Sequence, residues 1–169
     1  MKIGAICIWL GVLLACSPPV EIEENSDFIG TWNLEEWSST LSDGQIIYPY
    51  GENAYGRITY NPNGEMMCIL MADDRALMST IDIDTRIASE ALEAFNSFFA
   101  FSGPYAVNRD SSFVTHTIEG CINPNWVGVN QKRYFKFDDG KLTLSTPPIK
   151  VLNSESQETQ QVLVWSKVN

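Results

Sequence analysis

The chain has 169 residues, which is enough for one globular domain and a short additional segment. Its 21 acidic and 11 basic residues give a formal net charge of −10 and a pI of about 4.4, which argues against a nucleic-acid partner and against docking on anionic lipid through a basic face. Because 44% of the residues are hydrophobic, the chain can bury a core, and wholesale disorder is excluded.

Residues 1–15 are expected to be a cleaved lipoprotein signal peptide. Lys2 precedes an apolar run that is too short to cross about 30 Å of hydrocarbon as a helix. The run ends in Leu13-Leu14-Ala15-Cys16, which resembles the bacterial lipobox. This resemblance implies cleavage before Cys16 and attachment of diacylglycerol to its thiol. An ordinary secretory signal with an incidental cysteine is the alternative.

Residues 16–27 are expected to form a lipidated, acidic and proline-rich tether. A single acyl chain holds a protein only marginally, so the several chains of a mature bacterial lipoprotein would make its attachment to the membrane permanent. Ser17 follows Cys16 in place of the aspartate that favours retention at the inner membrane. We therefore expect a lipid-anchored protein of the bacterial cell envelope, on the outer membrane. The side of that membrane on which the domain lies is left open.

The cysteines give little sign of metal or redox chemistry. Once Cys7 leaves with the signal and Cys16 carries lipid, the domain of residues 28–169 keeps Cys68 and Cys121. In an oxidising compartment these two can form a disulfide, and two small buried thiols are the alternative. No Cys-x-x-Cys motif is present, and a single histidine excludes a multi-histidine metal site. The sequence therefore predicts no metal and no cofactor.

The chain after residue 27 reads as a series of short β-strands. The pairs Asp43-Gly44, Asn63-Gly64 and Asp139-Gly140 supply tight turns, and the last two mark hairpins. Because closure removes the exposed edges of an antiparallel sheet, the sequence predicts an all-β fold, an eight-stranded antiparallel β-barrel. The expected strands are 28–40, 55–61, 65–72, 104–108, 113–121, 132–137, 141–146 and 161–168.

The segment 85–101 departs from the strand pattern. Its apolar residues recur every fourth position, which predicts one inserted helix. Asp84 or Thr85 is expected to cap this helix, and Gly103-Pro104 is expected to end it. A helix inserted between barrel strands could plug or cover an open end of the barrel; packing on the outer wall is the alternative.

Strand alternation places three polar side chains inside the barrel. His116, the only histidine of the chain, lies on an apolar face of its strand, as Arg133 and Tyr60 do on theirs. An apolar interior with these groups suits a small ligand that has an apolar body and a polar or anionic end. Trp126, in a turn-rich loop, is expected either to line the cavity entrance or to anchor its own loop.

Structural roles are alternatives for two of these residues. His116 could be a hydrogen-bonded core residue, and Arg133 could stack on Trp32 and close one end of the barrel by a cation–π contact. A buried guanidinium needs some partner, which could be Glu119, a carbonyl, Trp32 or a ligand anion. Trp37 has the opposite parity to Trp32, so one of the two tryptophans is expected to face away from the interior.

Several blocks of the sequence resemble the bacterial lipocalin-like domain family. The first is Gly30-Thr31-Trp32, the Gly-x-Trp with which lipocalins open their first strand, so the resemblance gives Gly30 and Trp32 structural roles. Further similar blocks follow in order: Tyr48-Pro49-Tyr50-Gly51, Gly56-x-Ile58-Thr59-Tyr60-x-Pro62-x-Gly64, Val114-Thr115-His116-x-Ile118-Glu119-Gly120, Pro124-Asn125-Trp126-Val127-Gly128, Gln131-x-Arg133 and Leu142-x-Leu144-Ser145-Thr146-Pro147-Pro148. The resemblance implies a lipocalin-like barrel. Lys167 stands where lipocalins proper place an arginine over the tryptophan.

No catalytic residue is identified, because the sequence contains no Gly-x-Ser-x-Gly, P-loop or His-Glu-x-x-His motif. The sequence favours a binding protein for a small apolar or amphipathic ligand whose polar end lies near His116 and Arg133. Two alternatives remain. One is an isomerase- or cyclase-type enzyme that uses a His116–Glu119 pair in the cavity, and the other is an envelope accessory protein with a filled barrel. The oligomeric state is left open.

Overall fold

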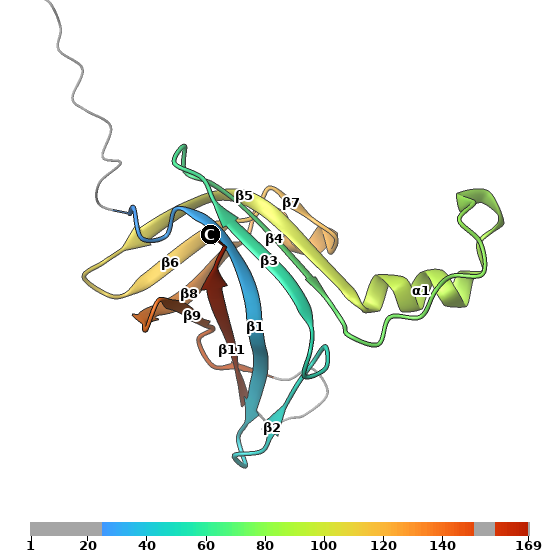
Figure 1. Cartoon of the computed structure of the whole chain (residues 1–169), viewed down its shortest axis with the longest axis horizontal. Helices are drawn as coiled ribbons and strands as arrows, with labels where there is room; N and C mark the ends of the chain where they lie inside the picture. The colour runs from blue at the N-terminus through green and yellow to red at the C-terminus, as the bar shows by residue number, and fades with distance from the viewer. Residues whose placement is uncertain (1–24, 151–157, 169) are drawn as a thin grey trace, which may run out of the picture.

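The computed structural model describes residues 25–150 and 158–168. The signal segment and Cys16 lie outside the described residues. The described part consists mainly of strands, with one α-helix and two short 3-10 helices (Figure 1). In chain order its elements are β1 (Gly30–Leu41), β2 (Ile46–Ile47), β3 (Tyr55–Tyr60), β4 (Glu65–Met71), η1 (Ile83–Thr85), α1 (Ala88–Asn96), β5 (Phe98–Asn108), β6 (Phe113–Thr117), β7 (Gly120–Cys121), η2 (Pro124–Trp126), β8 (Asn130–Asp138), β9 (Lys141–Ser145), β10 (Ile149–Lys150) and β11 (Glu158–Lys167).

Eight of the described strands form a closed antiparallel barrel. They follow the order β1-β3-β4-β5-β6-β8-β9-β11, and β11 pairs with β1 to close the sheet. Every strand pair along this path is antiparallel. The short strands β2, β7 and β10 lie beside it. The predicted eight-stranded antiparallel barrel is therefore confirmed.

The hairpin between β8 and β9 shows why the turn residues predict the register. Asp139 and Gly140 both have positive φ, +47° and +71°, which matches the right-handed twist of the flanking strands. With this two-residue turn in place, Asp138 pairs with Lys141 and Phe135 pairs with Leu144. The apolar members of these pairs consequently share the inner face of the barrel.

The predicted helix is shorter than expected, because its last residues belong to a strand. α1 ends at Asn96, and Phe99 and Phe101 lie in β5, opposite Leu70 and Cys68 of β4. Phe99 continues the four-residue spacing of the helix, but Phe99 and Phe101 are also two residues apart, as on one face of a strand, and pairing with β4 turns both rings inward. Gly103 does not end a helix either. It lies within β5, where a Cβ would come within 2.1 Å of the Thr117 carbonyl oxygen.

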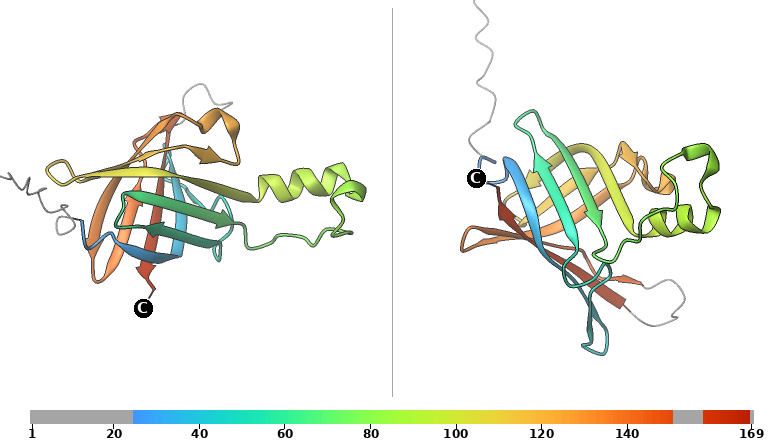
Figure 2. Two further views of the ribbon diagram at one scale, coloured as in Figure 1. Left: turned by 90° about the horizontal axis from the view of Figure 1, so that it is seen from above. Right: turned by 45° about the vertical axis from the view of Figure 1, so that its right-hand side comes forward.

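The expected caps and position of the helix are also wrong. Its N-cap is Ile87, which makes no side-chain capping bond, whereas Asp82 caps the preceding turn η1. α1 projects away from the barrel and neither plugs an end nor packs on the outer wall (Figures 1 and 2). None of its residues is buried. We call residues 72–97, which connect β4 to β5 through α1, the arm. No helix in the described ranges combines the length and apolar character needed to span a bilayer.

Candidate functional site

The barrel encloses a cavity of about 600 Å³. Apolar side chains from five strands form most of its wall, among them Ile58, Leu70, Phe101, Leu144, Leu163 and Trp165. The cavity opens at the end of the barrel where β4 leaves for the arm, and we call this end the mouth. Trp37, Tyr50, Phe99 and Trp126 line the mouth. A volume of this size and lining is typical of a site for a small, largely apolar molecule.

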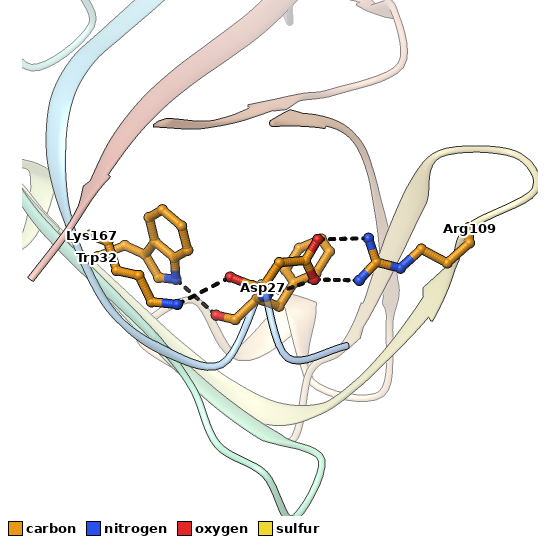
Figure 3. Close-up of polar contacts among 5 residues, drawn as sticks. Asp27, Trp32, Arg109 and Lys167 are labelled. Atoms are coloured by element: carbon orange, nitrogen blue, oxygen red, sulfur yellow. Dashed lines mark hydrogen bonds and ion pairs between the residues drawn. The ribbon is translucent and has the colours of Figure 1, made fainter. Parts of the chain in front are cut away.

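The opposite end of the barrel, which we call the floor, is closed by the turn at residues 25–28. Arg109 binds both carboxylate oxygens of Asp27, and the Trp32 indole donates from Nε1 to the Phe28 carbonyl oxygen at 2.8 Å (Figure 3). Lys167 donates from Nζ to the Asp27 carbonyl oxygen at 3.4 Å. The last residues of the segment expected to be a tether therefore pack against the barrel.

Aromatic rings fill the space above this turn. The Phe28 side chain is fully buried and makes edge-to-face contacts with Tyr60, Phe135 and Phe137, at ring-centroid distances of 5.2, 4.9 and 5.0 Å. Such contacts add about 0.5–1.5 kcal/mol each to the free energy of burial. The floor is consequently a packed aromatic layer, and the cavity lies between this layer and the mouth.

A tyrosine–histidine pair lies where the floor meets the cavity. The Tyr60 hydroxyl and His116 Nε2 are 2.9 Å apart, and each side chain is only 1% exposed. Burial and the positive charge of Arg133 together lower the pKa of His116 to about 3, so its imidazole is neutral at pH 7. Burial raises the pKa of Tyr60 well above its usual value, so its hydroxyl keeps its proton.

Arg133 brings a positive charge to this corner of the cavity. Its Nη1 donates to the Gln131 side-chain oxygen at 3.2 Å and to the Lys132 carbonyl oxygen at 2.9 Å. Burial lowers the pKa of Arg133, yet a guanidinium stays protonated at neutral pH. Burial also raises the pKa of Cys68 to about 12, against the opposing charge of Arg133. Lys132 lines the cavity too, but its Nζ lies over the rings of Phe113 and Tyr134, outside the lining, so Arg133 is the cation that faces the neutral groups of this corner.

The structure brings three of the four expected ligand-binding residues to the cavity wall. His116, Trp126 and Arg133 line it, whereas Tyr60 lies behind His116 and meets the cavity only through that hydrogen bond. The alternative in which Arg133 stacks on Trp32 is wrong. Lys167 takes this place, with its Nζ 5.1 Å from the ring centroid, because β11 pairs Lys167 directly with Trp32.

The Glu119 side chain is exposed, and the hydrogen bond of the fully buried His116 goes to Tyr60. Glu119 does not bind Arg133 either, since the guanidinium donates its hydrogen bonds to Gln131 and Lys132. The suggested His116–Glu119 pair is therefore not formed in this structure.

The expectation that Trp32 and Trp37 face opposite sides of β1 is wrong. The β1–β11 register shifts between Leu34 and Glu36, and this bulge reverses the alternation of side chains. Trp32 consequently packs in the floor and Trp37 lines the mouth, where its Nε1 donates to Gln161 at 2.7 Å. Sequence alternation assumes an unbroken strand, so it gave no signal for this change.

The sequence reasoning did not single out several residues that line the cavity. The sequence pattern assigns Phe99 and Phe101 to a helix, and it does not mark Gln161 and Trp165 of β11 as site residues. The alternation of Gln161, Leu163 and Trp165 along β11 is the signal that could have identified this part of the wall, since all three line the cavity.

Cys68 and Cys121 are both free thiols. They lie on opposite sides of Phe101, which pairs with Cys68 of β4 and with Cys121 of β7. Two strand spacings separate them by about 9–10 Å, which is too far for a disulfide. Within residues 25–150 and 158–168, no group of three or more His, Cys, Asp or Glu side chains could hold a metal ion.

The family model of a lipocalin-like domain matches residues 29–168, which span the whole barrel and the arm. No curated protein matches the chain.

Proposed function

Because the chain belongs to the lipocalin-like domain family, we propose that it binds a small, mostly apolar molecule in the barrel cavity, with the polar end of that molecule near His116 and Arg133. The observation that carries this proposal is the cavity of about 600 Å³, whose wall is mostly apolar and carries one buried histidine and one guanidinium. A barrel in a purely structural role would fill this space with side chains, since protein interiors are otherwise close-packed.

The chemistry of the polar corner suits binding better than acid–base catalysis. A general base works best with a pKa near the operating pH, and burial together with Arg133 places the pKa of His116 at about 3. The neutral imidazole is therefore suited to hydrogen bonding. The exposed Glu119 offers it no acidic partner.

Binding can be tested with Nile red, a neutral apolar dye whose fluorescence rises in apolar surroundings. We expect the wild-type chain to bind the dye, and Leu163→Trp, which places an indole in the cavity, to weaken dye binding at least tenfold. Val164→Trp is the matched control, because Val164 is the next residue on β11 and does not line the cavity. Equal binding by the two variants would contradict a site inside the barrel.

We further propose that Cys16 carries lipid and anchors the protein to the bacterial outer membrane. The support is the lipobox-like Leu13-Leu14-Ala15-Cys16 at the end of an apolar run. Cys16→Ala is expected to abolish incorporation of labelled palmitate and to leave the precursor unprocessed. Unchanged palmitate labelling of the variant, or processing at the same site without any lipid, would contradict this assignment.

A further inference from the structure

Arg133 has no anionic partner among the described residues of the cavity. The ion pairs among the described residues are Arg109–Asp27, Lys136–Asp138 and Lys141–Glu35, and they lie at the outer surface or the floor, not in the cavity. None of the described residues that line the cavity is an aspartate or a glutamate. Because an uncompensated buried charge destabilises a protein strongly, a site of this kind favours an anion.

His116 presents a second donor without an acceptor. Its Nδ1 is buried and has no hydrogen-bond partner within residues 25–150 and 158–168. If Nε2–H donated to Tyr60, the tyrosine O–H would itself lack an acceptor, because its hydrogen bond is the one to His116. If the tyrosine donates to Nε2, Nδ1–H is the one group of the pair without a hydrogen-bond partner. The second arrangement leaves fewer unsatisfied groups, so Tyr60 holds His116 as the Nδ1–H tautomer.

The strand register places these two donors near each other. In the β6–β8 pairing, Arg133 lies opposite Val114 and His116 lies opposite Gln131. Arg133 and His116 are thus diagonal neighbours on the inner face, with backbones about 7–8 Å apart, which an arginine side chain spans easily. A group with two acceptor atoms can meet both donors at once.

We propose that the ligand is an apolar monocarboxylic acid, whose carboxylate accepts hydrogen bonds from the Arg133 guanidinium and from Nδ1–H of His116. This inference rests on the proposed function and names the class of molecule that the cavity takes. Tyr60 acts as a positioning residue, because it fixes the tautomer without touching the ligand.

The charge of the site selects a monoanion. Lys132 also lines the cavity, but its ammonium lies over the rings of Phe113 and Tyr134, which do not. One guanidinium and one neutral N–H are therefore the groups that balance charge in the cavity, and they suit a single negative charge better than a dianionic phosphate. The chain as a whole carries a net charge of −10, which repels anions from its surface. A cation enclosed in the cavity of so acidic a protein is complementary to a ligand that buries its charge there.

The test compares dodecanoic acid with 1-dodecanol as displacers of Nile red from the full-length chain at pH 7.5. The two molecules have the same chain length, and only the acid is charged. Arg133→Leu is expected to weaken binding of the acid about 10- to 150-fold, the range for hydrogen bonds to a charged group, and to change binding of the alcohol less than about threefold. Lys136→Leu is the control, since it removes a cation from the outer face of the same strand.

Tyr60→Phe gives an independent measurement. Loss of the hydroxyl releases the His116 tautomer, so binding of the acid should weaken about 2- to 10-fold while binding of the alcohol stays unchanged. If Arg133→Leu weakens both molecules equally or neither, the carboxylate assignment is overturned and the proposed function stands. If the wild-type chain binds neither Nile red nor either displacer, the proposed function itself fails.

Discussion

The floor and the mouth of the barrel use the same strands in different ways. At the floor, Phe28 and Trp32 are buried to 0% and 2% exposure, and Arg109 and Lys167 hold the turn that covers them. At the mouth, the arm carries large apolar side chains that remain in solvent, with Leu77 at 96% and Leu92 at 60% exposure. The floor therefore stabilises the fold, whereas the mouth leaves the interior accessible.

The largest expected effect comes from removing the indole of the floor. Trp32→Ala should lower the free energy of unfolding by about 3–5 kcal/mol, the cost of deleting a buried aromatic side chain. The variant also loses the hydrogen bond to the Phe28 carbonyl and the contact with Lys167. Urea denaturation at pH 7.5 measures the change, and Trp32→Phe serves as the milder variant if the alanine variant does not fold.

The matched control is Trp126→Ala at the mouth. Trp126 is only partly buried and packs edge-to-face on Phe99, with centroids 4.9 Å apart. We expect a loss of about 1 kcal/mol, in the range of one aromatic pair. Similar losses for the two tryptophans would show that the two ends contribute equally to stability, and would contradict the conclusion that the floor stabilises the fold more than the mouth does.

The next effect is a loss of stability at acidic pH, caused by His116 at the boundary between the floor and the cavity. Burial and Arg133 hold the pKa of His116 at about 3 in the folded chain, against 6.5 for an ordinary histidine. Below pH 6.5 the unfolded state therefore binds a proton that the folded state does not, so stability is lost as the pH falls from 6.5 towards 3. At pH 5 the loss relative to pH 7.5 is about 2 kcal/mol, at 1.4 kcal/mol for each pH unit.

Urea denaturation of wild type and His116→Gln at pH 7.5 and pH 5 isolates this contribution. The glutamine variant lacks the titrating group, so its stability should fall less between the two pH values. An identical fall for both proteins would mean that His116 already titrates normally in the folded chain.

A smaller effect is expected from the ion pair at the floor. Burial alone would raise the pKa of Asp27, but the hydrogen bond and charge of Arg109, together with backbone N–H donors, lower it. Its carboxylate therefore contributes stability above pH 3.8 that is lost as the pH falls through the lowered pKa. Because both side chains are partly exposed, Asp27→Asn should cost about 1 kcal/mol at pH 7.5. Melting curves of the two proteins should converge once the pH falls below the lowered pKa of Asp27.

The sequence predicted the regular parts of the barrel better than its irregular ones. The alternation around His116 and Arg133 correctly placed both inside, because β6 and β8 run without interruption. The bulge in β1 could not be read from the sequence, since neither Glu35 nor Glu36 marks an extra residue in the strand.

Long side chains and ambiguous periods account for the other errors in the site. The choice between Arg133 and Lys167 over Trp32 depended on which strand ends at the floor, and only the pairing of β11 with β1 decides it. Phe99 fits a period of two and a period of four alike, and tertiary pairing with Leu70 decides between them. These are contacts between distant segments, which local patterns do not encode.

The smallest effect is expected in the arm. Leu92 and Phe95 are 60% and 48% exposed, and no residue of α1 is buried. Leu92→Ser and Phe95→Ser should therefore change the free energy of unfolding by less than about 0.5 kcal/mol, as surface substitutions do. Because α1 projects beyond the mouth (Figure 2), binding of Nile red should also stay within about twofold of wild type, within about 0.4 kcal/mol. Unfolding in urea measures the stability of the two variants, and dye titration measures their binding of Nile red. A loss of dye binding without a loss of stability would mean that the apolar face of the arm contacts the bound molecule, and the arm would then be part of the binding site.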